Sequence, residues 1–225
     1  MKTKSVRIYE QGSYDVLKIE ETNIPTLKSN EVLIKHHYLG LNYIDINQRN
    51  GSYKIKELPT NVGMEASGII EEVGEDVKRI KVGDRVTHCM NLGSFTQYFV
   101  LNENRLVKLK NNLNLKLAAA STLQGLTAQY LTQKSWEVKN QHYVLIHAAS
   151  GGVGQILTQW SKIIGATVIG TVSNDYKASI AKNIGCDFVI NYSNENFENK
   201  VNELTNKHGA DVIYDAVGKD TFEKG

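Results

Sequence analysis

The sequence predicts an α/β protein in which a β-rich first half precedes a parallel, doubly wound sheet. Two observations carry this prediction. Short apolar runs separated by turn residues fill the first half, and strand-like runs alternate with helix-like segments in the second half. Strand–helix–strand alternation favours a parallel sheet with right-handed crossovers. This change in the pattern of segments divides the chain into two expected domains, residues 1–125 and residues 126–225.

The first half contains five segments with the composition of strands. They are rich in β-branched and aromatic residues, and Gly, Asn and Asp separate many of them, as at 50–51 and 81–84. The five segments are 5–10, 31–40, 66–74, 84–89 and 94–102. We therefore expect a β-domain here.

The second half contains four strand-like and three helix-like segments in strict alternation. The expected strands are 143–148, 166–173, 187–192 and 211–218, and the expected helices are 152–165, 176–185 and 195–209. Each helix ends on a glycine, which is the usual residue just beyond a helix C-terminus. These four strands correspond to part of a doubly wound sheet, which has six strands in its full form.

Composition excludes several classes of function. Apolar residues make up 41% of the chain, which supports a packed core, and 26 basic and 24 acidic residues in mixed order give a net charge of +2. This pattern leaves no basic stripe for nucleic acid and no polybasic anchor, and the apolar runs are short for a membrane span or a signal peptide. Cys89 and Cys186 form no disulfide framework. We expect a cytoplasmic protein with no nucleic-acid or membrane partner.

The strongest motif lies between the first strand and the first helix of the second half. Ala149, Gly151 and Gly154 fit the spacing G-x-G-x-x-G with Ala in the first place. The missing Cβ at Gly151 lets the backbone approach a diphosphate, and the one at Gly154 lets helix and strand pack closely. The helix N-terminus offers N–H groups and a positive dipole. The sequence predicts dinucleotide binding at residues 151–154, against the alternative of a plain glycine turn.

The end of the next strand indicates which dinucleotide binds. In a site for NADH an acidic residue often holds the ribose 2′-hydroxyl there, about 20 residues after the glycines. This chain has Ser173 in that place and Lys177 four residues later. A small polar residue beside a cation suits a 2′-phosphate, so we predict NADPH as the cofactor. Asp175 weakens the preference if its carboxylate faces the pocket, and the ordinary alternative for Lys177 is a solvated position.

Four motifs follow one another along the chain: residues 41–53, 63–86 and 118–131, and then the glycine stretch. Together they resemble the quinone oxidoreductases of the zeta-crystallin type, a zinc-free branch of the medium-chain dehydrogenases and reductases. The resemblance runs from about residue 5 to the end. It implies a GroES-like β-domain, a Rossmann domain, and NADPH:quinone oxidoreductase activity on a quinone or a related enone. For full-length members it implies a homodimer.

The resemblance also bears on metal binding. A catalytic zinc needs three protein ligands, and zinc alcohol dehydrogenases place a Cys where this chain has Asn42 and a His where it has Met64. Two cysteines cannot form the four-cysteine structural site. The pairs 36–37 and 88–89 contain adjacent residues, whose side chains point to opposite faces of a strand. We expect no metal site.

Family resemblance further assigns the site residues. The implied catalytic residues are Asn42, as a donor to a substrate carbonyl, Asp45, and Tyr53 at the mouth of the pocket. The implied cofactor-binding residues are Tyr43, Ile44, Asp45, Ile46, Asn47, Tyr130, Gly151, Gly152, Val153, Gly154, Ser173, Lys177, Tyr192 and Val217. The ordinary alternatives are that Asn42 caps a turn, that Asp45 caps a helix beginning at residue 46, and that the tyrosines fill cores.

Two further ionisable residues are expected to be structural. Glu65 is interpreted as a buried carboxylate rather than a proton donor, and His147 as a buried or half-buried histidine whose hydrogen bonds are satisfied. The chain also ends seven residues after the fourth strand of the second half. We therefore expect a C-terminally truncated member of the family with an exposed edge at that strand. The alternatives to an active enzyme are a remnant that at most binds NADPH and, less in keeping with Asn42 and Met64, a zinc alcohol dehydrogenase.

Overall fold

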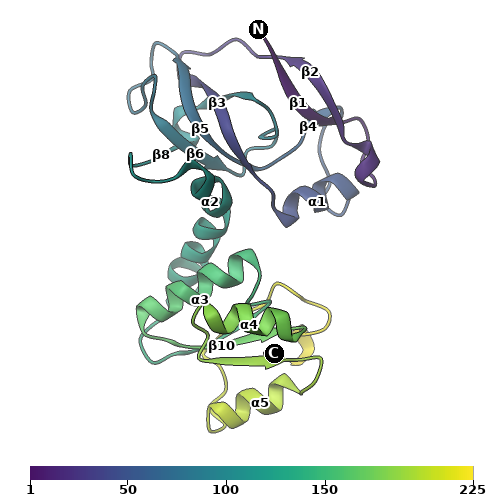
Figure 1. The fold of residues 1–225 in the computed structure, drawn as a ribbon, viewed down its shortest axis with the longest axis vertical. Helices are drawn as coiled ribbons and strands as arrows, with labels where there is room; N and C mark the ends of the chain where they lie inside the picture. Colours follow the sequence, from purple (N-terminus) through teal and green to yellow (C-terminus); the bar gives the residue numbers. More distant parts are fainter. Residues whose placement is uncertain (225) are drawn as a thin grey trace. The chain divides into compact units, whose positions relative to one another are not determined.

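The computed structural model describes residues 1–224. The chain divides into two compact units, residues 1–123 and 124–225, and helix α2 (Leu115–Tyr130) crosses the boundary (Figure 1). The boundary expected from the sequence, between residues 125 and 126, lies within the same helix. The predicted fold class, a β-rich domain followed by part of a doubly wound parallel sheet, is confirmed.

Two antiparallel sheets form unit 1. The smaller sheet has the order β2 (Lys18–Asn23), β1 (Lys2–Ile8), β4 (Thr60–Asn61). The larger sheet has the order β7 (Tyr98–Asn102), β3 (Glu31–Gly40), β5 (Glu65–Val73), β6 (Arg85–Cys89), β8 (Val107–Lys108). Each of the five expected strands has a counterpart here: β3 has the expected bounds, and the other four differ from the expected bounds at one end or at both. Helix α1 (Tyr43–Asn50) joins β3 to β4.

The core of unit 1 lies on one face of the larger sheet. Val32 and Ile34 of β3, Ile70 of β5 and Val86 of β6 pack there with Leu106. The alternation of side chains along each strand brings these residues to one face. At about 25 cal/mol per Å² of apolar surface, each such fully buried aliphatic side chain contributes on the order of 1.5–3 kcal/mol.

Strand β2 and helix α2 have no counterpart among the elements expected from the sequence. Strand β2 reads KIEETN and has an exposed, charged surface, so it lacks an apolar run that would mark a strand. Helix α2 reads LKLAAASTLQGLTAQY and has apolar residues on every side, so no apolar stripe with a helical period marks it. In both cases contacts with the rest of the fold decide the element.

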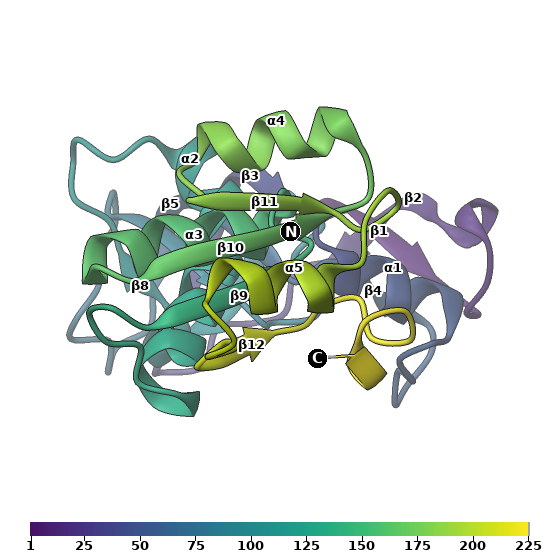
Figure 2. The same ribbon diagram turned by 90° about the horizontal axis from the view of Figure 1, so that it is seen from below.

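A four-stranded parallel sheet forms unit 2. Its order is β11 (Phe188–Asn191), β10 (Thr167–Val172), β9 (Tyr143–His147), β12 (Val212–Tyr214), as Figure 2 shows, and β12 lies at an edge as expected. The helices are α3 (Gly152–Ile164), α4 (Asp175–Asn183) and α5 (Phe197–Leu204). Helix α5 ends before the expected Gly209, because Asn206 and Lys207 adopt φ values of 53° and 66°.

Alternate residues of each central strand point to opposite layers of this unit. Val144 and Ile146 of β9 belong to the cluster that contains Leu157 of α3. Leu145, between them, belongs to the cluster that contains Phe197 and Val201 of α5. Helices therefore cover both faces of the sheet, which is the arrangement that a nearly continuous apolar strand requires.

A histidine pair connects two strands inside unit 1. His36 Nδ1 lies 2.9 Å from the carbonyl oxygen of Thr96, which can only accept, so Nδ1 carries the proton. His36 Nε2 therefore accepts from His88 Nε2 at 2.9 Å when both rings are neutral. Burial lowers the pKa of His36 to about 4 and that of His88 to about 3. No local sequence pattern indicates this pair, because the two residues are 52 positions apart.

Acid should destabilise unit 1 through this pair. The unfolded chain takes up protons below a histidine pKa of about 6.5, whereas the folded pair stays neutral to about pH 4, so stability falls as the pH falls through this window. In this window each histidine lowers the free energy of unfolding by about 1.4 kcal/mol per pH unit, or by about 2 kcal/mol between about pH 6.5 and about pH 5. Urea unfolding at about pH 7 and about pH 5 measures the loss.

A matched variant tests the assignment. His37→Ala removes the exposed neighbour on β3, whose charge is the smallest of the causes acting on the His36 pKa, and should leave most of the pH dependence in place. Replacement of both His36 and His88 by Leu should flatten it. Equal stability of the unmodified chain at the two pH values would contradict the role of the pair.

Candidate functional site

The glycine motif forms a tight turn between β9 and α3. Ala148 adopts a left-handed conformation with φ of 52°, and Gly151 is the N-cap of the helix. Gly154 is buried, and a Cβ there would lie 2.5 Å from the Ala148 carbonyl oxygen and 2.8 Å from Ala149 Cα. The last glycine of the motif therefore lets helix and strand approach closely, as the spacing predicts.

The first turn of α3 offers donors to an anion. The first bond along the helix runs from Gln155 N to Gly151 O at 2.9 Å. The N–H groups at the start of a helix precede such bonds and lack partners within the helix. Gly151 and Gly152 are exposed, and a Cβ on Gly151 would meet only the Ala148 carbonyl oxygen, at 3.1 Å. The turn has the form of a cradle for a diphosphate at the positive end of the helix dipole.

Ser173 and Lys177 come together just beyond the end of β10. Lys177 Nζ donates to Ser173 Oγ at 3.0 Å, across one turn at the start of α4. Ser193 Oγ donates to the Ser173 carbonyl oxygen at 2.9 Å and ties the end of β11 to the same place. Asn174 accepts from Lys177 N at 2.9 Å and caps α4. A cation and a hydroxyl thus stand together at the carboxyl end of β10.

Asp175 does not share this arrangement. Its Oδ1 accepts from Asn191 Nδ2 at 2.9 Å, so the carboxylate is engaged with the last residue of β11. The sequence left open whether this acid faces the pocket and opposes a phosphate. The bond to Asn191 gives it a structural partner instead.

Three other residues assigned to the cofactor lie elsewhere in unit 2. Tyr192 follows β11, is half-buried beside Phe197, and borders a hollow of about 350 Å³ that Asp220 also lines. Val217 is half-buried, and its N–H donates to Asp215 Oδ1 at 2.7 Å. Tyr130 is the last residue of α2 and is exposed.

His147 departs from its expected role as a satisfied histidine. It is only 2% exposed, and Nδ1 lies 2.7 Å from Thr171 Oγ1. Its Nε2 is buried with no hydrogen-bond partner, so one side of the ring is unsatisfied. Burial lowers the pKa of His147, and the nearby charge of Asp215 opposes that shift. The sequence could not show this, because the ring is half-enclosed by α5 through Phe197.

The residues assigned to catalysis begin at helix α1 of unit 1. The helix starts at Tyr43, and Asn42 is its N-cap. Asp45 is the third helical residue, and its Oδ2 accepts from Asn42 N at 2.8 Å. The alternative that Asp45 caps a helix beginning at residue 46 is therefore wrong. The physical reason is the reciprocal cap, in which the side chain of the third helical residue, Asp45, accepts from the N–H of the N-cap residue, Asn42.

Asn42 also contacts a buried acid. Its Nδ2 donates to Glu65 Oε2 at 2.7 Å, and Glu65 Oε1 accepts from Leu123 N at 2.7 Å. Glu65 is 0% exposed, which agrees with its interpretation as a buried carboxylate. Burial raises the pKa of Glu65, while the hydrogen bond from Asn42 and those from the backbone of α2 oppose the rise. Burial likewise raises the pKa of Asp45.

The remaining residues of this segment are more open. Tyr43 is 76% exposed, Ile46 is exposed, and Ile44 and Asn47 are half-buried. Tyr53 is exposed, and its N–H donates to the Asn47 carbonyl oxygen at 2.9 Å. The structure thus gathers the assigned residues from 42 to 53 in unit 1 and the glycine turn with Ser173 and Lys177 in unit 2.

The places of the zinc ligands hold side chains with other partners. Asn42 is bonded to Glu65, and the Met64 thioether accepts from Gln48 Nε2 at 3.5 Å. Within residues 1–224, no group of three or more His, Cys, Asp or Glu side chains has the arrangement of a metal site. Over the same residues, no helix combines the length and the apolar character needed to cross a bilayer.

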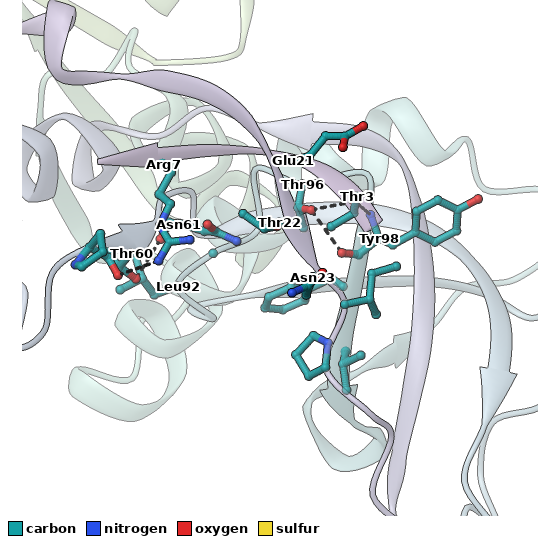
Figure 3. Close-up of a pocket in the computed structure, with 16 residues that line it drawn as sticks. Thr3, Arg7, Glu21, Thr22, Asn23, Thr60, Asn61, Leu92, Thr96 and Tyr98 are labelled. Carbon is teal, nitrogen blue, oxygen red and sulfur yellow. Dashed lines mark hydrogen bonds between the residues drawn. The ribbon is translucent and has the colours of Figure 1, made fainter. Parts of the chain in front are cut away.

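Unit 1 also contains a cavity apart from the assigned residues. It has a volume of about 590 Å³ and lies among β1, β2, β4 and β7 (Figure 3). Its lining is mostly polar side chains: Thr3 and Thr96 share a hydrogen bond of 3.1 Å, and Arg7 donates to the Pro59 carbonyl oxygen at 3.3 Å. Asn42, Asp45 and Tyr53 do not line it.

Comparison with known proteins identifies the family. The model of the alcohol dehydrogenase GroES-like domain matches residues 28–111, and that of the zinc-binding dehydrogenases matches residues 152–225. The quinone oxidoreductase of Pseudomonas aeruginosa is 40% identical over 98% of this chain and 68% of its own length. The chain belongs to the quinone oxidoreductase family. The resemblance predicted from the four motifs is thereby confirmed.

Other quinone oxidoreductase relatives agree along the whole chain. The structure of Escherichia coli quinone oxidoreductase complexed with NADPH has a TM-score of 0.95 at 37% identity, covering 98% of this chain and 68% of that one. The 2-haloacrylate reductase of a Burkholderia species is 40% identical over 96% of this chain and 67% of its own length. The chain spans about two thirds of these relatives. Zinc independence stays a prediction, which metal analysis of the purified protein tests.

The packing at Gly154 gives a direct prediction. Gly154→Ala should destabilise unit 2 by about 1–3 kcal/mol, because its Cβ would overlap the backbone at residues 148 and 149. Gly125→Ala, in helix α2 with open space around its Cβ position, should instead gain roughly 0.5–1 kcal/mol. Urea unfolding of both variants measures the difference, and equal effects would contradict the proposed close contact.

Proposed function

We propose that this chain acts in the NADPH-dependent reduction of a quinone or a related enone. The observation that carries the choice of cofactor is the contact between Lys177 Nζ and Ser173 Oγ at 3.0 Å. In this proposal the positive charge and the hydroxyl would hold the 2′-phosphate of the adenosine ribose. The E. coli relative is named as a complex with NADPH, which supports the same choice.

The residues of unit 2 fit this cofactor. The N–H groups at the start of α3 would hold the diphosphate in the cradle that Gly151 and Gly154 leave open. Ser173 and Lys177 would hold the 2′-phosphate. The proposal extends to Tyr192 beside the adenosine and to Tyr130 and Val217 along the cofactor. When bound, NADPH supplies a hydride.

The residues of unit 1 would orient the substrate. Asn42 is a neutral donor for a substrate carbonyl oxygen, and its position is fixed by the cap of α1 and by Glu65. A hydrogen bond to the carbonyl stabilises the negative charge that develops there as the ring or double bond is reduced. In this proposal the segment 43–47 borders the nicotinamide ribose, Asp45 holds the backbone of Asn42, and Tyr53 closes the mouth of the pocket.

The names of the relatives support the substrate class. The names quinone oxidoreductase and 2-haloacrylate reductase both denote the reduction of a conjugated system. In a quinone this system is a ring that includes the carbonyl groups, and in an acrylate it is a double bond next to a carboxyl group. Such matches along nearly the whole chain favour an enzyme over a remnant that at most binds NADPH. A homodimer, which the resemblance implies for full-length members, remains a proposal that light scattering on the purified chain tests.

Cofactor binding should depend on Lys177. Lys177→Ala should weaken NADPH binding about 10- to 100-fold, because a hydrogen bond to a charged group contributes roughly 1.5–3 kcal/mol. NADH binding should not change. Lys182→Ala, which removes another exposed lysine of α4, is the control and should leave both affinities unchanged. Titration followed by nicotinamide fluorescence measures them, and an equal loss for NADPH and NADH would contradict the assignment.

Turnover tests the reaction itself. The chain should oxidise NADPH in the presence of a simple benzoquinone or an enone, and a chelator should not slow it. Asn42→Ala should lower kcat/KM about 10-fold or more, in line with the loss of an oriented donor. Binding of NADPH with no turnover of either substrate class would overturn the proposed reaction while leaving the cofactor assignment in place.

A further inference from the structure

Glu65 occupies a position prepared for a carboxylate. It begins β5 and pairs with Gly40 of β3 on one side and Cys89 of β6 on the other. A Cβ on Gly40 would collide with Glu65 Oε2 and with the Ala119 carbonyl oxygen. The absence of a side chain at Gly40 therefore leaves the room that the acid fills, and no larger residue fits there without a shift.

The two carboxylate oxygens serve two different elements. Oε2 accepts from Asn42 Nδ2 at the start of α1, and Oε1 accepts from Leu123 N in α2, both at 2.7 Å. One rigid group thus connects the amide of Asn42 to the backbone of a second helix. Bonds of this length to an ionised acceptor are the strong kind, and they fix direction as well as distance.

The electrostatic environment of Glu65 makes these hydrogen-bond donors important for keeping its carboxylate ionised. The charged and titratable groups beside Glu65 are Asp45 of α1, whose charge adds to the effect of burial in raising the pKa of Glu65, and Cys89 of β6, whose pKa is raised by burial and then by the charge of Glu65. Burying an ionised carboxylate is costly unless hydrogen bonds satisfy it. The donors that satisfy Glu65 are those of Asn42 and of the α2 backbone, so the ionised acid and the orientation of Asn42 depend on one another.

We propose that Glu65 is a positioning residue, which fixes the amide of Asn42 in the orientation that acts on the substrate carbonyl. This inference rests on the proposed function of Asn42. Asp45 accepts from the backbone N–H of Asn42 through Oδ2 at 2.8 Å, and its own backbone faces the side-chain oxygen of Asn42 in the capping box, whereas Glu65 holds the Nδ2 donor. Glu65 transfers no proton in this role and does not touch the substrate.

The test compares two buried acids. Glu65→Gln keeps the shape but replaces one acceptor oxygen by a donor, so either Asn42 Nδ2 or Leu123 N faces another N–H. Glu103→Gln is the matched control: Glu103 is also buried and also accepts backbone N–H groups, from Lys78 and Arg79. We expect Glu65→Gln to lower kcat for quinone reduction about 10-fold or more, with the KM and the NADPH affinity within about twofold. Glu103→Gln should leave kcat unchanged.

A spectroscopic readout separates this inference from the proposed function. The side-chain NH₂ resonances of Asn42, assigned by their loss in Asn42→Ala, should exchange slowly with solvent in the unmodified chain. They should exchange faster in Glu65→Gln and remain slow in Glu103→Gln. Fast exchange in the unmodified chain, or no change in Glu65→Gln, would overturn the positioning role whether or not the chain turns over.

A pH series on the unmodified chain needs no variant and covers the case in which Glu65→Gln does not fold. Protonation of Glu65 weakens the acceptor, so the Asn42 resonances should move as the pH falls, with a midpoint above the usual range of a glutamate. Asn42 resonances that do not respond would overturn the inference. If the Asn42 side-chain NH₂ exchanges slowly and in a Glu65-dependent way but the unmodified chain is inactive, the result counts against the proposed function alone. If Glu65→Gln is active with an unchanged kcat, the result counts against the inference alone.

Discussion

Helix α3 approaches the end of β9 so closely that a single methyl group at residue 154 would meet the backbone of residues 148 and 149. The arrangement of the nucleotide end of unit 2 depends on this contact. It sets the start of α3 directly after the turn, so the N–H groups of its first residues emerge at the carboxyl edge of the parallel sheet. It also brings Leu157 of α3 into the cluster with Val144 and Ile146, which holds the helix on the sheet.

The neighbouring strand leads to the residues to which the proposed function assigns cofactor selectivity. Strands β9 and β10 are in register from Thr167 opposite Tyr143 to Thr171 opposite His147, so the residue two positions after Thr171 lies beyond the sheet. That residue is Ser173, and the first turn of α4 brings Lys177 within hydrogen-bond distance of it. An exposed lysine here retains its hydration until a phosphate binds, and its attraction to the phosphate weakens with salt. In the proposed function, the cofactor preference therefore comes from two residues placed by strand register and a helix cap.

Buried polar groups organise unit 1 in a comparable way. Glu65 and the pair formed by His36 and His88 lie inside a domain whose apolar core is modest, and each is held by donors and acceptors from distant parts of the chain. Because an unpaired polar group inside a protein costs about 1–3 kcal/mol, these bonds select one arrangement of the strands and helices around them. The same requirement that stabilises the β-domain also orients Asn42. Stability and the candidate site thus share one set of contacts.

The sequence by itself determined the order of strands and helices in unit 2, the glycine turn, the pairing of Ser173 with Lys177, and the family. These features are local: apolar period, glycine positions and a spacing of four residues along a helix carry them. Only the tertiary structure decided that Asn42 meets Glu65, that His36 meets His88, that His147 is left half-satisfied, and that α2 is a helix. Those contacts join residues from 23 to 52 positions apart or depend on burial from several sides, and no local pattern records them because strand pairing and packing bring them together.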